Sequence, residues 1–212
     1  MNKTTKVWLT IVCVAILVVG AVFGTLAYFT DNDAATNTFT VGKVGITLDE
    51  SDESTADKSD RTTVGNSYHL LPGSSYVKDP TVTVEAGSSE AYVRMIVTVN
   101  FAEALTDDQL VASVDNVFDG YKEDLWPRAS KTVSADKKTV TYEYRYYDTV
   151  ETGDQAKALE PLFTNVVIPE EATYDDLKVF NGMTIAVVAH AVQAEGFANE
   201  DAAWVAFGQQ NP

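Results

Sequence analysis

Cysteine and histidine are nearly missing from this sequence of 212 residues. The single cysteine, Cys13, lies in the leading apolar segment, and the two histidines are His69 and His190. A chain that begins after that segment can form no disulfide, no thiolate metal site and no cysteine nucleophile. Neither histidine has a partner at metal-ligand spacing, and no His-Glu-x-x-His occurs, so each is interpreted as a structural strand residue.

Short catalytic motifs are absent as well. The sequence contains no Gly-x-Ser-x-Gly and no phosphate-binding loop. Carboxylates are numerous, but no sequence context singles out two of them as the acid and base of a glycosidase. The sequence therefore predicts a protein that is not an enzyme and that has no cofactor and no metal.

Positive charge is scarce. Fifteen Lys and Arg stand against 31 Asp and Glu, which gives a formal net charge of −16, and loss of the two lysines in residues 1–27 takes it to −18. Such a field repels a phosphate backbone and anionic lipid, so we expect no nucleic-acid partner. We interpret the charge as a solubility device, with cation binding as the alternative. Residues 49–66 are rich in acids but lack the residue order of a calcium loop, so a solvated loop is favoured.

The only long apolar run stands at the N-terminus. A short basic stretch with Lys3 and Lys6 precedes the uncharged run from Val7 to Phe23. Small residues follow at Thr25 and Ala27, directly before Tyr28. This order is typical of a secretory signal peptide that is cleaved before Tyr28.

Two outcomes remain open for this segment. Cleavage would release residues 28–212 to the extracellular matrix or the cell surface. An uncleaved anchor is the alternative, because Val7 to Phe29 is long enough to span a bilayer. In that case the protein contacts the membrane only through this segment.

Period-two alternation dominates residues 28–212, which we interpret as a single domain. Residues 91–101, 139–147 and 183–194 alternate most clearly, and 183–194 is apolar on both faces, as in a central strand. Residues 36–48 alternate with a change of phase at Gly42-Lys43, which suggests a bulge between two strand segments. Without a βαβ rhythm, we expect seven to nine strands in an all-β, antiparallel two-sheet jelly-roll-like sandwich.

Helices are expected only as short insertions. Thr106 begins a capping box that predicts a helix over about 107–114, and the region from there to Ser130 is expected to be irregular. A last helix is predicted from the cap residue Asn199 through Trp204 and Phe207, with Gly208 as its end.

Three tyrosines share one face of the strand at 139–147, namely Tyr142, Tyr144 and Tyr146. Such a row can stack on sugar rings. Cross-strand packing is the favoured interpretation, since aromatic rows on strands more often serve it.

Several segments together resemble the TasA–camelysin family. They are Gly24–Asp31, Ala35–Gly42, Leu71-Pro72-Gly73, Lys78-Asp79-Pro80, Ala91–Arg94 and Ala191–Phe197. The first two are the most specific, and residues 102–180 offer little to match. The resemblance implies a jelly-roll protein of Gram-positive biofilm fibres, released by a SipW-type signal peptidase.

The resemblance also implies a mode of assembly. In that family the N-terminal strand freed by cleavage completes the sheet of the next subunit. We therefore expect a head-to-tail homopolymer whose donor-type strand lies within about 28–48 and carries Phe29, Phe39 and Val41. A co-secreted matrix protein is left open as a further partner.

Two other functions stay open. One is a monomeric surface adhesin or binding module that contacts its ligand through the tyrosine row or the acidic loop. An unpaired N-terminal strand in the monomer is expected for a fibre subunit, and one docked in its own sheet for an adhesin. The other is a camelysin-type metallopeptidase, which the missing zinc motif disfavours.

Overall fold

The computed structural model describes residues 30–33, 44–55, 60–66, 71–107, 117–170, 180 and 182–210, with only the backbone for 30–33. The protein is mostly β, with antiparallel sheets and one C-terminal helix in this part of the chain. No helix of the described residues is both long and apolar enough to cross a bilayer.

The largest sheet has five antiparallel strands in the order β1-β12-β6-β9-β8. Its members are β1 (Thr30–Asp33), β6 (Ala91–Asn100), β8 (Arg128–Val133), β9 (Thr139–Arg145) and β12 (Thr184–Gln193). The longest ladder joins β12 to β6 along all ten residues, from Thr184 opposite Asn100 to Gln193 opposite Ala91. The N-terminal β1 flanks β12 on its other side.

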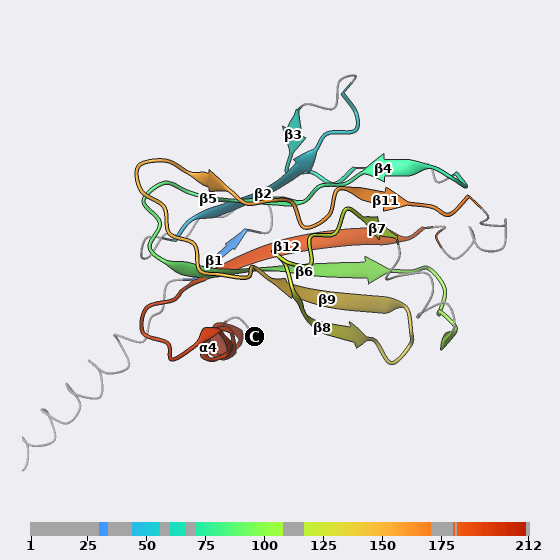
Figure 1. Cartoon of the computed structure of the whole chain (residues 1–212). Helices are drawn as coiled ribbons and strands as arrows, with labels where there is room; N and C mark the ends of the chain where they lie inside the picture. The colour runs from blue at the N-terminus through green and yellow to red at the C-terminus, as the bar shows by residue number, and fades with distance from the viewer. Residues whose placement is uncertain are drawn as a thin grey trace, which may run out of the picture.

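Two smaller sheets complete the fold. The order is β10-β5-β2-β3 in one and β4-β11-β7 in the other. Their strands are β2 (Ile46–Ser51), β3 (Arg61–Thr62), β4 (Ser75–Val77), β5 (Thr81–Val84), β7 (Phe118–Asp119), β10 (Lys157–Ala158) and β11 (Asn165–Val167). Figure 1 shows the sheet of β2 and β5 lying above the five-stranded sheet, with β4 and β11 beside it.

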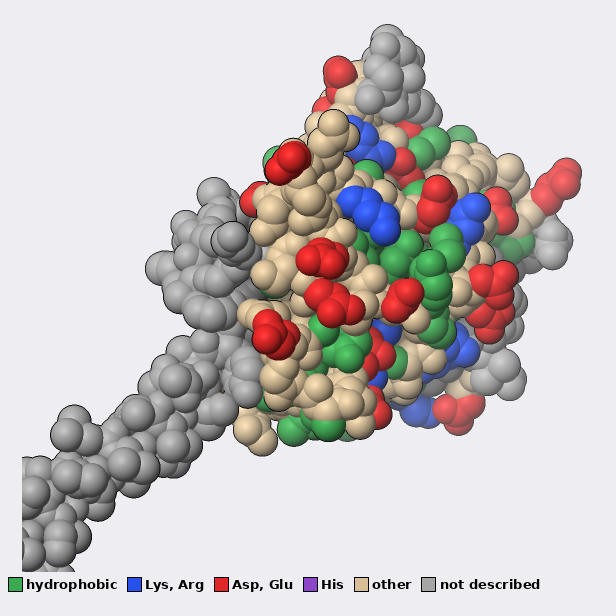
Figure 2. Space-filling view, turned by 60° about the vertical axis from the view of Figure 1, so that its left-hand side comes forward, with side chains coloured by type: hydrophobic (Ala, Val, Ile, Leu, Met, Phe, Trp, Pro, Cys, Tyr) green, Lys and Arg blue, Asp and Glu red, His purple; other side chains and the backbone are tan. Residues whose placement is uncertain are grey.

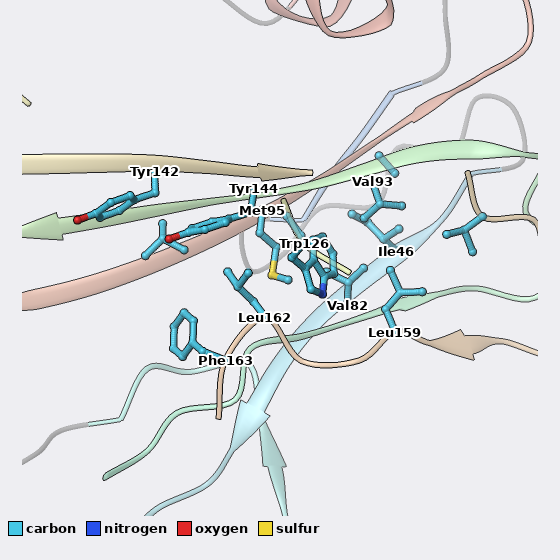
Figure 3. Packing of buried hydrophobic residues seen from close by; sticks show 14 of the residues in the cluster. Ile46, Val82, Val93, Met95, Trp126, Tyr142, Tyr144, Leu159, Leu162 and Phe163 are labelled. Atoms are coloured by element: carbon cyan, nitrogen blue, oxygen red, sulfur yellow. The ribbon is translucent and has the colours of Figure 1, made fainter. Parts of the chain in front are cut away.

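The main hydrophobic core lies between these layers. Met95 of β6, Ile46 of β2 and Val82 of β5 belong to one buried cluster, which also takes in Trp126 and Phe163 from the connecting segments. Figure 3 shows these side chains pointing toward one another from both layers. Burial of apolar surface on this scale is the main force that holds two sheets together.

The clearest alternation in the sequence is confirmed by burial. Along β6 the residues alternate between buried and half-buried from Ala91 to Val99, and β9 does the same from Thr139 to Arg145. The tyrosine row therefore faces the core. Tyr142 is fully buried and Tyr144 is 5% exposed, so the packing interpretation is confirmed and a sugar-stacking row on this face is wrong.

The outer face of β6 and β12 is covered by helix α4 (Glu200–Gln210). Trp204 and Phe207 form a second buried cluster there with Val192 of β12, and Figure 1 shows α4 on the side of the large sheet away from β2. Asn199 caps the helix as predicted, since its Oδ1 accepts a hydrogen bond from the backbone N–H of Ala202 at 2.9 Å. The predicted end at Gly208 is wrong, because the helix continues to Gln210.

Other expectations need correction. Twelve strands are present in the described residues rather than seven to nine, because several ladders are only two or three residues long. The acidic stretch 49–66 is not one loop, since β2 runs to Ser51 and pairs with β3. The segment before Ser130 is not wholly irregular, as it holds β7 and the start of β8. The predicted helix after Asp107 and the bulge at Gly42-Lys43 lie outside the described residues.

Candidate functional site

The N-terminal edge of the large sheet is the first part of the candidate site. Thr30 lies opposite Val192 and Asp33 opposite Ala189, so β1 covers only one half of β12. The other half, from Thr184 to Val188, has a ladder partner only on its β6 side within the described ranges. An uncovered row of strand N–H and C=O groups is a template for another strand.

A cavity of about 280 Å³ adjoins that half of β12. Its wall comes from three places, namely β2, the segment from β3 to Gly65, and β12. Ile185 and Val187 of β12 pack against the main core from this position. Leu48 of β2 and the exposed Val64 add further apolar surface. The cavity thus joins an apolar lining to a strand edge.

A buried ion pair forms part of the cavity wall. Lys78 Nζ lies 2.5 Å from Glu50 Oε2, with the two side chains only 7% and 11% exposed. The side-chain amide of Asn66 donates to the other carboxylate oxygen, Glu50 Oε1, at 3.1 Å. Both oxygens of one carboxylate are thereby engaged, as a buried charge requires.

The rim of the cavity carries a second ionic group. Arg61 of β3 lies between Asp49, at 2.7 Å from its Nη2, and Asp79, at 2.5 Å from its Nη1. Burial alone would lower the pKa of Arg61, but its hydrogen bonds and charge interactions with the two carboxylates raise it above the usual value. Asp79 also accepts from the Ser51 backbone N–H at 2.7 Å and from its hydroxyl at 3.0 Å. The rim is therefore a connected polar network that ties β2 to β3.

The residues predicted for cleavage and assembly are Thr25, Ala27, Tyr28, Phe29, Phe39 and Val41, and all lie outside the described residues. So does His69. His190 is a strand residue of β12, as expected: its ring lies 4.7 Å from that of Phe207, and its Nδ1 accepts a hydrogen bond from Arg94 Nε at 3.2 Å. The described residues contain no group of three or more His, Cys, Asp or Glu that could hold a metal.

Sequence reasoning missed the polar wall of the cavity. It assigned Asp49 and Glu50 to a solvated loop, whereas Glu50 is 8% exposed at the end of β2. Lys78 and Asp79 were noticed only within a family-like block. The sequence around Lys78 carries no clear signal, since Asp79 follows it directly and a Lys-Asp pair before a proline is ordinary for an exposed turn.

Acidic side chains are scattered across the face drawn in Figure 2, with lysines and arginines between them. The formal net charge of the whole chain is −16. Comparison with known proteins adds no identification: no family model, no curated protein and no solved structure matches this chain.

Proposed function

We propose that this chain is a secreted structural protein that assembles into extracellular fibres by exchange of its N-terminal strand. The proposal includes a two-sheet jelly-roll-like sandwich as the subunit, residues 1–27 as a signal removed by a SipW-type peptidase, and residues 28–212 as the fibre-forming domain. The observation that carries it is the half of β12 from Thr184 to Val188 that β1 leaves uncovered beside the cavity, where an incoming strand could extend the sheet.

The register of that ladder supports the chosen assembly residues. Odd-numbered residues of β12, such as Ala189 and Ala191, face the main core. Thr30 lies opposite Val192, so odd-numbered residues of the N-terminal segment pair with this core-facing set. Phe29, Phe39 and Val41 are all odd-numbered. A strand that continues in the same register would place Phe39 opposite Met183, which packs against the core, whereas Val41 would lie beyond the start of β12 at Thr184. Asp31 and Asp33 of β1 share the odd parity.

The cavity supports a longer ladder than four residues. In the same register, residues 35–37 of the incoming strand would pass Val187, Ala186 and Ile185, which line the cavity. Strand addition of this kind gains main-chain hydrogen bonds from the edge and side-chain contacts from the pocket. The apolar lining and the strand edge are the two components that such docking needs.

A ladder closed within one chain is compatible with one closed between chains. The contacts are the same in both cases, and the difference is the entropy of joining separate molecules. High local concentration, as after secretion, favours the exchanged form. Repetition of a head-to-tail contact gives an open filament. A co-secreted protein that presents the first free edge would act as a nucleator.

Electron microscopy of the secreted domain tests this proposal. Residues 28–212 should form fibres, and a truncation that begins at Gly42 should not. Phe39→Asp should abolish fibres because it directs a charge to the core side. Thr40→Asp is the matched control, since residue 40 faces the opposite side in this register. Normal fibres from Phe39→Asp would contradict the proposal.

The adhesin is the second candidate, and one observation favours it. β1 is docked in the sheet of its own chain, as expected for a monomeric surface protein. Its contact surface would then be the cavity and the polar rim around Arg61, since Tyr142 and Tyr144 are buried and Tyr146 packs against the core. Monodisperse particles from both the full domain and the Gly42 truncation, with no fibres after addition of a nucleating protein, would select this function. A metallopeptidase would instead show bound zinc and proteolysis that chelation stops.

A further inference from the structure

We infer that Lys78 and Asn66 become joined by an intramolecular isopeptide bond, formed with Glu50 as the catalytic residue. This inference is independent of fibre assembly. It rests on Glu50 and Lys78 in the cavity wall and on Asn66 next to them, since the side-chain nitrogens of Lys78 and Asn66 both contact the Glu50 carboxylate. Glu50 comes from β2, Lys78 directly follows β4, and Asn66 follows the short strand β3.

The arrangement of atoms around Glu50 matches the two ends of an amide exchange. The nucleophile, Lys78 Nζ, lies 2.5 Å from Oε2. The leaving nitrogen, Asn66 Nδ2, lies 3.1 Å from Oε1 of the same carboxylate. One carboxyl group therefore contacts both the proton that must leave the amine and the nitrogen that must receive one.

The amide oxygen of Asn66 is also positioned for reaction. The backbone N–H of Glu53 donates to Asn66 Oδ1 at 3.0 Å. Negative charge collects on this oxygen when an amine adds to the amide carbon, and a fixed N–H donor stabilises that charge. The orientation of the amide is fixed independently, because Asn66 Nδ2 also donates to the Ser51 carbonyl at 2.8 Å.

The reaction needs no oxidant and no cofactor. Lys78 Nζ transfers a proton to the Glu50 carboxylate and adds to Asn66 Cγ to give a tetrahedral intermediate. The C–Nδ2 bond then breaks while the Glu50 carboxyl returns the proton to the departing nitrogen. Nζ–Cγ replaces Nδ2–Cγ, the second proton of the Lys78 ammonium leaves with the departing nitrogen, and the by-product is the ammonium ion, so the protein loses the mass of one ammonia. Glu50 ends as the carboxylate that it was at the start.

The surroundings favour such a step. Lys78 and Glu50 are 5% and 8% exposed as whole residues. Leu48, Pro80 and Ile185 line the same cavity. Little water competes for the amine there. The bond would link the segment after β3 to the end of β4 in residues 28–212, which contain no cysteine.

Intact-mass spectrometry of the full chain, secreted from its host and purified, tests the inference directly. The N-terminus is first fixed by sequencing. We expect a mass about 17 Da below that of the sequence, which is the mass of the ammonia lost. A mass equal to that of the unmodified sequence would overturn the inference.

Chymotryptic digestion separates the bond from a simpler loss of ammonia. A cyclic imide at Asn66 also loses ammonia but joins nothing. Cleavage after Tyr68 or Leu71 should leave the fragments that contain Asn66 and Lys78 covalently joined. Fragments that separate would overturn the inference even if the mass is low.

Variants assign the roles. Glu50→Gln keeps the shape but cannot carry the proton, and Asn66→Ala removes the acceptor and leaves the Lys78–Glu50 pair intact. Both should show the unmodified mass, with folding checked by circular dichroism. Asn100→Ala is the control, since this asparagine bonds Thr184 on another sheet, and it should keep the loss of mass. A bond that still formed in folded Glu50→Gln would overturn the role of Glu50.

Discussion

The guanidinium carbon of Arg94 lies 4.2 Å from the ring centroid of Trp204 and 5.0 Å from that of Phe207. Arg94 belongs to β6 and both rings belong to α4, so this contact joins the helix to the outer face of the large sheet. Burial lowers the pKa of Arg94, and Glu143 opposes that shift. Arg145 adds a second link through Asp201, at 2.6 Å. The C-terminal helix is thus held by aromatic packing and by charge.

Loss of the Trp204 ring should detach α4. Trp204 is 5% exposed, so we expect Trp204→Ala to lower the free energy of unfolding by about 3 kcal/mol. Val205→Ala is the matched control on the same helix. Val205 is 62% exposed, and its truncation should change stability by less than about 0.5 kcal/mol. Urea denaturation of both variants measures the difference, and equal losses would contradict this packing.

His190 should make the domain less stable in mild acid. Burial and the nearby Arg94 lower the pKa of His190 from its usual value near 6.5 to about 4, with Glu143 opposing the shift. Above pH 6.5 the ring is neutral in both folded and unfolded chains, so it contributes no pH dependence. Between pH 6.5 and 4 the unfolded chain binds a proton that the folded chain does not. The free energy of unfolding therefore decreases as the pH is lowered through this range. The loss should reach about 2–3 kcal/mol by pH 4.

Denaturation curves of the wild type and His190→Gln over pH 7 to 4 isolate this effect, because the other titrating groups are common to both chains. The variant should show a shallower fall in stability than the wild type. Parallel pH profiles would mean that His190 titrates normally.

Tyr142 and Tyr147 separate core packing from surface recognition. Tyr142 is fully buried, with its ring 6.0 Å from that of Tyr144 and 6.3 Å from that of Phe118. We expect Tyr142→Ala to lower the free energy of unfolding by about 3–5 kcal/mol. Tyr147 is 59% exposed, so Tyr147→Ala should change the free energy of unfolding by less than about 0.5 kcal/mol. Thermal unfolding of the pair checks both values, and a harmless Tyr142→Ala would refute the assigned core.

Asp79 and Asp107 compare a connected network with an isolated surface pair. Asp79 accepts hydrogen bonds from Ser51 and Arg61, and its side chain is 19% exposed. Asp79→Asn should therefore lower the free energy of unfolding by about 1.5–3 kcal/mol. Asp107 pairs only at the surface with Lys137, where its side chain is 85% exposed. Asp107→Asn should therefore have an effect below about 1 kcal/mol, which added salt reduces further. Similar losses for both variants in urea would contradict the network.

The alternation of apolar and polar residues predicted the long strands well, because successive side chains of a strand point to opposite faces of the sheet. The face with Met95 and Val97 and the face with Arg94 and Thr98 are distinguished by burial as the sequence indicates. Ile96 lies on the second face and is half-buried. The short ladders escaped prediction, since two or three residues such as Phe118–Asp119 are too few to show a period.

The cavity was not predictable from local pattern. It joins Glu50, Lys78 and Ile185, which come from three separate segments, and only the sheet topology brings them together. Acidic composition pointed to solvent for Glu50, but tertiary pairing with Lys78 overrode that preference. The prediction that the helix ends at Gly208 failed for a related reason. A glycine is tolerated inside this helix because Trp204 and Phe207 already pack the helix against the sheet.

Cysteine mixing tests the central claim, exchange of the β1·β12 ladder, most directly. Asp31 lies opposite Ala191, and residues 28–212 contain no native cysteine. A mixture of Asp31→Cys and Ala191→Cys domains, oxidised after assembly, should give disulfide-linked dimers that neither variant gives alone, and the double variant should give longer linked species. If the mixture stays monomeric while the double variant closes a disulfide within each single chain, the ladder is intramolecular and the proposed exchange is wrong.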